Sequence, residues 1–251
     1  MTRSERCERT TVMAVLKRVA RALRPRDDHP RRPGSAGERE LQARLGTAER
    51  AEQFYRNQLA RQLTPVMKEF IGRMEMAFIA TSDADGECDC SFRAGPAGFI
   101  RVLDDVTVAY PEYRGNGVMA SLGNMLVNPH IGIFLVDFTR DLIGLHVNGE
   151  ASIVPDARMR ELDLDLDLGQ PEAAGPSRRP VQWVLVNVTE AYIHCSKHIP
   201  LLVPQSRVRH WGTDNPRHKG GDYFGVQTAA APADSAAAPP ASPAAPAPTR
   251  V

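Results

Sequence analysis

Short apolar runs separated by turn residues fill the chain between residues 77 and 154. The first run, residues 77–82, stops at the sequence DADG (residues 83–86), and a second run follows at residues 87–92. Aspartate and glycine are typical of tight reversals, so this pattern predicts a β-hairpin.

A second hairpin and two longer strands are predicted after it. Residues 99–103 run into two aspartates, and residues 106–110 then alternate with the period of two of a half-buried strand. Residues 131–138 are apolar on both faces, as in a central strand, and a turn leads to residues 143–154. Residues 181–194 resume strand character. A closed or nearly closed antiparallel barrel is the economical way to bury so many short strands.

Helices are predicted before the strands. Residues 38–63 have helical composition with a partial apolar stripe, which the Gly-Thr pair at residues 46–47 divides into two pieces. Thr64 and Pro65 are typical of an N-cap and first helical residue, and they open a further helix over residues 66–73. We expect these helices to serve packing rather than chemistry.

One loop interrupts the strands and has the chemistry of an anion site. YRGNG (residues 113–117) leads into a predicted helix at residues 118–127, which Asn128 and Pro129 end. Backbone N–H groups at a helix start, glycines that allow close approach and one guanidinium together favour phosphate. An ordinary Gly-Asn-Gly turn is the alternative interpretation of the same residues.

Three segments resemble a known family. They are SFRAGPAGFIRVLDD (residues 91–105), YPEYRGNGVMASLGNMLVNPHIGIFLVDF (residues 110–138) and LHVNGEA (residues 145–151). Together they resemble the pyridoxamine 5'-phosphate oxidase-like family, the flavin-binding split barrels. AYIHCSKHIP (residues 191–200) is similar to the His-Cys-x-Lys segment of a bacterial branch of that family. The resemblance implies a mainly β fold, a six-stranded antiparallel split β-barrel with flanking α-helices.

The resemblance also implies a homodimer with two FMN molecules at the subunit interface. By matching position, Arg93 and the backbone of Arg101, Val102 and Leu103 would lie along the flavin. The phosphate would be surrounded by Tyr113, Arg114, Gly115, Asn116 and Ser121, with Lys197 approaching from the later strand. A surface salt bridge is the alternative role for Arg93.

The implied activity is that of an FMN-dependent oxidoreductase, which transfers hydride between a nicotinamide or small organic substrate and flavin. The alternatives are an F420- or haem-binding split barrel and a non-catalytic flavin-binding or sensing protein. Members of the branch often carry arginine at the positions of His146 and Glu150, so neither residue receives a family role. Arg209-His210-Trp211 does not match the Arg-x-His substrate clamp of true pyridoxamine phosphate oxidases. His146 and His194 are candidate acid–base groups, although a lone histidine on a strand is more often structural.

Charge and cysteine content limit the partners. The 251 residues include 31 basic and 30 acidic side chains, so no broad field favours nucleic acid. No apolar run reaches the ~18 residues of a transmembrane helix. The spacing of Cys88 and Cys90 does not favour a disulfide, so we expect reduced, buried thiols and a cytoplasmic protein. A zinc site that joins this pair to His194, Cys195 and His198 is the less favoured alternative.

The ends of the chain differ from the middle. Residues 1–37 are basic, and we expect them to be disordered or partly helical. After the helices of residues 38–76 and a flavin-binding domain at residues 77–204, residues 205–226 are expected to pack on the barrel or dimer. Residues 227–251 are rich in alanine and proline, which predicts a disordered tail.

Overall fold

A computed structural model of the protein describes residues 33–161, 179–205, 209–210, 213 and 215–227. The chain divides into two compact units, residues 1–213 and residues 214–251. Most of the predicted basic extension (residues 1–32) and of the predicted tail (residues 228–251) lies outside the described residues.

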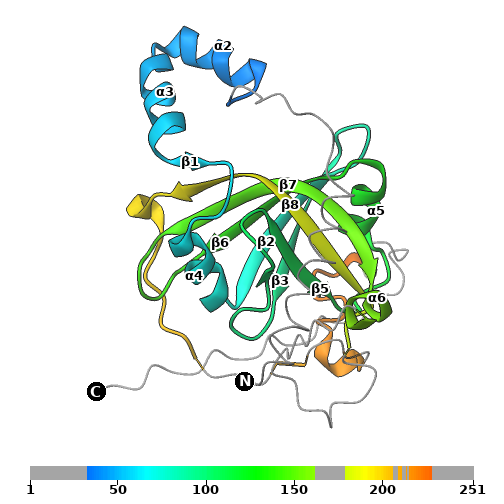
Figure 1. Ribbon diagram of the computed structural model, residues 1–251. Helices are drawn as coiled ribbons and strands as arrows, with labels where there is room; N and C mark the ends of the chain where they lie inside the picture. The colour runs from blue at the N-terminus through cyan, green and yellow to red at the C-terminus, as the bar shows by residue number, and fades with distance from the viewer. Residues whose placement is uncertain (1–32, 162–178, 206–208, 211–212, 214, 228–251) are drawn as a thin grey trace. The chain divides into compact units, whose positions relative to one another are not determined.

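The first unit is built on one antiparallel sheet (Figure 1). Its strands are β1 (Leu59–Ala60), β2 (Met76–Ser82), β3 (Cys88–Ala94), β4 (Arg101–Val102), β5 (Thr107–Glu112), β6 (His130–Val136), β7 (Gly144–Pro155) and β8 (Gln182–His194). Their order is β3-β2-β6-β7-β8-β5-β4, and β1 pairs with β8. The predicted split-barrel class is confirmed. The described residues form eight strands instead of six, because the two-residue strands β1 and β4 join the six longer ones.

Both predicted hairpins are present, and their turns show why. Asp83 follows β2, and its Oδ1 accepts hydrogen bonds from the backbone N–H groups of Asp85 and Glu87, both at 2.9 Å. Gly86 has a φ of 89°, a conformation that glycine adopts without strain. In the second hairpin, Asp104 Oδ1 accepts a 2.8 Å hydrogen bond from the backbone N–H of Val106. Aspartate side chains therefore set both reversals.

Alternate residues of the long strands form the core. Ile79, Ile133 and Val147 on β2, β6 and β7 are each at most 1% exposed, and Val184 and Val186 on β8 are fully buried. The helix α4 (Pro65–Arg73) adds buried Phe70 and Ile71 to the same cluster. The half-buried strand predicted at residues 106–110 is wrong in this respect, because every residue of β5 is buried.

The helices before the sheet agree with the sequence in part. The division at Gly46 is confirmed, but the predicted helical segment of residues 38–63 is wrong at its end: helix stops at Asn57, because residues 59–60 form β1 and pair with β8. Ser35 and Glu38 form a capping box at the start of α2 (Ala36–Leu45), and Gly46 ends it with a φ of 66°. The helix α3 (Ala48–Asn57) follows at once. Thr64 Oγ1 accepts a 3.2 Å hydrogen bond from the backbone N–H of Met67, which confirms the predicted N-cap of α4.

Two further helices belong to the first unit. The helix α5 (Ala120–Val127) begins two residues later than predicted, because Met119 adopts a left-handed conformation with a φ of 58°. The helix α6 (Asp156–Glu161) follows β7. No helix within the described residues is long and apolar enough to cross a membrane.

The described part of the second unit contains one short element. The 3-10 helix η4 (Pro216–His218) is capped by Asn215, whose side chain accepts a 3.0 Å hydrogen bond from the backbone N–H of Arg217.

Candidate functional site

A polar cluster joins β3, β5 and α5. Arg93 Nε on β3 donates to Glu112 Oε1 on β5 at 2.8 Å, and Arg93 Nη2 donates to Ser121 Oγ on α5 at 3.3 Å. Ser121 Oγ also lies 2.8 Å from Asp89 Oδ2 and 3.1 Å from Ser91 Oγ. We call these five residues the Arg93 cluster.

The alternation of β3 explains why the cluster forms. Asp89, Ser91 and Arg93 are alternate residues and share one face of the strand. Ser121 lies in the first turn of α5 and is 3% exposed, so the helix covers this face. Glu112 ends β5, and its side chain is 8% exposed. The cluster thus links the edge strand β3 to a strand at the far end of the sheet order.

The two carboxyl groups of the cluster have opposite electrostatic environments. Burial raises the pKa of Glu112, while the charge and hydrogen bond of Arg93 act in the other direction. Hydrogen bonds from Ser91 and Ser121 lower the pKa of Asp89. Asp89 is therefore an ionised acceptor at neutral pH, and it holds two hydroxyl groups.

The predicted phosphate loop follows Glu112 directly in the chain. Arg114, Gly115 and Asn116 are exposed, and Asn116 Oδ1 accepts a 3.0 Å hydrogen bond from the backbone N–H of Val118. A Cβ atom built on Gly115 would meet nothing within 4 Å. The loop is therefore open to solvent and joins the Arg93 cluster to the start of α5.

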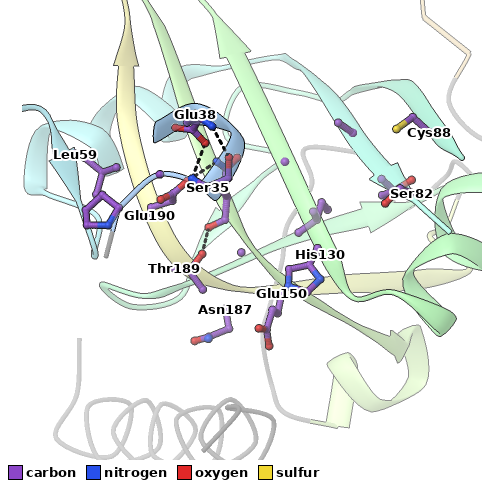
Figure 2. A pocket seen from close by; sticks show the side chains of 18 of the residues that line it. Ser35, Glu38, Leu59, Ser82, Cys88, His130, Glu150, Asn187, Thr189 and Glu190 are labelled. Atoms are coloured by element: carbon purple, nitrogen blue, oxygen red, sulfur yellow. Dashed lines mark hydrogen bonds between the residues drawn. The ribbon is translucent and has the colours of Figure 1, made fainter. Parts of the chain in front are cut away.

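A cavity of about 840 Å³ lies on the opposite face of the sheet. Figure 2 shows Ser35 and Glu38 at one side of it and Ser82 and Cys88 at the other. Its floor comes from alternate strand residues that face away from the core: Ala80, Cys90, Gly132, Asn148, Glu150 and Glu190. The space arises because the adjacent residues Ala80, Cys90 and Gly132 have small side chains or none. A signal for the cavity is present in the sequence, since these residues alternate with the core positions.

A family model described as pyridoxamine 5'-phosphate oxidase matches residues 63–195, more than half of the chain. The chain belongs to the pyridoxamine 5'-phosphate oxidase family. The matched residues include β2 to β8 and all of the Arg93 cluster. The family predicted from the sequence is confirmed. No match was found among curated proteins.

Three solved structures are among those to which the chain is similar. A substituted HupZ of Group A Streptococcus is 25% identical, with 53% of this chain and 99% of that chain covered and a TM-score of 0.41. General Stress Protein 26 of Bacillus anthracis is 17% identical, with coverages of 50% and 89% and a TM-score of 0.34. An F420 reductase is 18% identical, with coverages of 51% and 94% and a TM-score of 0.34.

Members of the pyridoxamine 5'-phosphate oxidase family generally bind FMN, and the donors around α5 fit its phosphate. Arg93 and Ser121 lie within hydrogen-bonding distance of each other, and the open loop of residues 113–117 lies directly before the helix. A guanidinium, a hydroxyl and backbone amides are the groups from which phosphate oxygens accept hydrogen bonds. Asp89 and Glu112 are competing acceptors for these donors.

The other predicted family residues are placed apart from the cluster in one chain. Arg101 and Val102 form β4 and pair with Ala109 and Val108 of β5, and Leu103 N–H donates to Thr107 O. Lys197 lies in the 3-10 helix η3 (Ser196–His198), after the end of β8.

The pairing of β2, β6, β7 and β8 gives the level of the sheet at which β8 ends and the level at which α5 contacts β2. The end of β8, His194, pairs with Gly144, whereas α5 contacts β2 at Thr81, level with Gly149 on β7. Five residues of strand span about 17 Å. The end of β8 and the contact between Asn124 and Thr81 are therefore at different levels of the sheet.

The two candidate histidines are in contact, so neither is a lone histidine. His146 Nε2 lies 3.3 Å from His194 Nδ1. The ring of His146 stacks between Phe134 and Tyr192, with centroid distances of 4.4 and 4.7 Å. Burial, together with the neighbouring His194, lowers the pKa of His146. This sandwich places the imidazole in a packing role on the sheet face opposite the core.

The cysteine prediction was wrong about burial. Cys88, Cys90 and Cys195 are free and exposed, since they occupy the outward positions of β3 and the end of β8. Among the described residues, no group of three or more histidine, cysteine, aspartate or glutamate side chains is placed to hold a metal ion. The zinc alternative fails there because Cys88 pairs with Ser82 while His194 pairs with Gly144, at opposite ends of the strands.

Proposed function

We propose that the protein binds FMN and is a flavin-dependent oxidoreductase. The observation that supports the proposal is the meeting of Arg93 and Ser121 at the first turn of α5, directly after an open Gly-containing loop. It occurs within residues 63–195, the part of the chain that matches a family whose members generally bind FMN.

The proposed phosphate contacts come from both sides of Ser121. Arg114 supplies charge from the exposed loop, and Tyr113, Gly115 and Asn116 supply backbone or side-chain groups. Arg93 supplies the second guanidinium from β3. The backbone of residues 101–103 offers donors and acceptors to the edge of the ring system.

The proposed assembly is a homodimer with the cofactor between subunits. Lys197 lies in η3, after the end of β8, whereas Ser121 lies in the first turn of α5. A second chain would bring Lys197 to the site from outside. Bound FMN would supply hydride transfer, while the protein positions it and excludes water.

Replacement of Arg114 by alanine tests the phosphate site. We expect FMN to bind about tenfold more weakly or worse, because a charge-assisted hydrogen bond contributes roughly 1.5–3 kcal/mol. Riboflavin, which lacks the phosphate, should bind equally to both proteins. Arg44→Ala on α2 removes another exposed arginine and should leave both affinities unchanged. Unchanged FMN affinity in Arg114→Ala would contradict the proposed site.

Reduction of the bound flavin by an electron donor distinguishes an oxidoreductase from a protein that only binds FMN. An oxidoreductase is expected to bleach its flavin absorbance when NADH or NADPH is added without oxygen. A protein that holds FMN tightly and is not reduced by either donor or by small organic substrates would be a flavin-binding module instead.

A further inference from the structure

The single proton of the Ser121 hydroxyl is already in use. A hydroxyl group has one proton to donate and two lone pairs to accept with. Arg93 Nη2 donates to Ser121 Oγ, so this contact uses a lone pair. At 2.8 Å, the carboxylate oxygen Oδ2 of Asp89 is the nearest acceptor, and it takes the proton. A phosphate at this helix start therefore finds Ser121 without a free proton.

The negative charge of Asp89 is also unfavourable beside a phosphate, which is an anion too. Its Oδ2 accepts a second hydrogen bond from Ser91 Oγ at 2.7 Å, and both bonds favour the ionised carboxylate. Two anions that need the same hydroxyl exclude each other, because each loses hydrogen bonds and they repel. The carboxylate of Asp89 thus accepts the hydrogen bond that Ser121 would otherwise donate to a bound anion.

Glu112 completes this arrangement on the other side. It accepts from Arg93 Nε, while Arg93 Nη1 donates to the backbone oxygen of Phe92 at 3.1 Å. Within the Arg93 cluster one guanidinium therefore faces two carboxylates. Arg93 is thus shared between Glu112 and Ser121, which leaves fewer of its donors for a phosphate.

We propose that Asp89 is an internal competitor of the phosphate and sets how strongly the site discriminates FMN from riboflavin. This inference rests on the proposed FMN site. Binding of the phosphate ester requires Ser121 to turn its proton away from Asp89. Binding of riboflavin leaves the Asp89–Ser121 hydrogen bond intact. Asp89 therefore weakens the binding of FMN and leaves the binding of riboflavin unchanged.

A purely structural role for Asp89 makes a different prediction. Asp89 links β3 to α5 through Ser121, so its loss could loosen the helix. Loosening would weaken the binding of FMN and of riboflavin together and would lower the melting temperature. Removal of Asp89 as a competitor instead changes the ratio of the affinities for FMN and riboflavin. A change in stability alone would leave this ratio the same.

The test is a titration of the full chain with FMN and with riboflavin, followed by quenching of flavin fluorescence. The variants are Asp89→Asn, which keeps the shape of the side chain, and Asp89→Ala, which also removes the acceptor. Asp85→Asn removes an equal charge from the exposed turn of the same hairpin and serves as the matched control. Melting temperatures identify any variant that does not fold.

In Asp89→Asn we expect FMN to bind about tenfold more tightly relative to riboflavin than in the unchanged protein. Asp89→Ala should shift the ratio in the same direction, and Asp85→Asn should leave it unchanged. A ratio that stays the same or falls in folded Asp89 variants overturns the inference while FMN binding stands. If the unchanged protein binds no FMN but Asp89→Asn does, the competition is supported. If none of the proteins binds FMN, both the site and the competition are wrong.

Discussion

Arg93 and Glu112 form an ion pair across the split of the barrel, with 2.8 Å between Nε and Oε1. Arg93 lies on β3, one edge of the sheet, and Glu112 ends β5, which lies beside the other edge strand, β4. At its end β5 pairs with β8 on one side, and because β4 covers only Val108 and Ala109, the other side of β5 at Glu112 is left to side-chain contacts. The pair therefore holds the two edges of the sheet together beside α5.

Loss of Arg93 should destabilise the protein in a pH-dependent way. Arg93→Met leaves the carboxylate of Glu112 buried without its cation, which costs about 3 kcal/mol of unfolding free energy. Burial alone raises the folded-state pKa of Glu112 above its unfolded value, so the folded state binds a proton more readily. The cost should therefore be greatest above the folded pKa and should shrink as the pH falls. Urea unfolding without flavin at pH 7.5 and pH 5 measures both effects.

The double variant Arg93→Met with Glu112→Leu is the control for this prediction. It removes both charges, and hydrophobic replacement of a buried pair is often neutral, so most of the lost stability should return. If Arg93→Met lowers the unfolding free energy equally at pH 7.5 and pH 5, the loss does not come from an unpaired charge on Glu112, and the prediction is wrong.

The histidine sandwich predicts a loss of stability in mild acid. Burial and His194 lower the folded-state pKa of His146 below its unfolded value, so the unfolded state binds the proton first. The contribution of His146 to stability is complete above the unfolded pKa of about 6.5 and is lost as the pH falls through the folded pKa. His146→Phe keeps an aromatic ring between Phe134 and Tyr192 and should flatten this decline. The measurement is the unfolding free energy between pH 7.5 and pH 5.

His198→Gln is the matched control, since His198 is exposed in η3 and should leave the decline unchanged. A decline of the same steepness in His146→Phe would assign the acid sensitivity to other groups.

Gly149 should not tolerate a side chain. It lies at the β-bulge of β7, where a Cβ atom would come within 2.9 Å of both the carbonyl carbon of Asn187 and Val186 Cγ1. Gly149→Ala must push β7 and β8 apart, and we expect a cost of about 2 kcal/mol. Gly72→Ala, in α4 with nothing within 4 Å, should be neutral or stabilising by up to about 1 kcal/mol. Equal melting temperatures of the two variants would contradict the close approach at the bulge.

The strands and caps were predictable because their causes are local. Apolar runs bounded by turn residues predicted the strands that hold Ile79 and Val147, and Thr64 and Gly46 marked helix ends by their own hydrogen bonds and φ angle. The start of α5 was missed because Met119 adopts a left-handed conformation that its side chain does not favour.

The candidate site was only partly predictable, because its contacts cross the split. Alternation put Cys88 and Cys90 on one face of β3 but did not say which face α5 would cover. Glu112 is 19 residues from Arg93 in the chain, and no local pattern pairs them. For Arg93 the sequence allows a surface salt bridge or a flavin contact. Its ion pair is partly buried, and the flavin contact stays a prediction.

The absorbance of the purified full-length protein between 300 and 500 nm tests FMN binding most directly. We predict bands near ~375 and ~450 nm, and we expect the released cofactor to have the mass of FMN. A colourless protein that takes up no FMN on titration, or that takes up F420 or haem instead, would contradict the proposed cofactor.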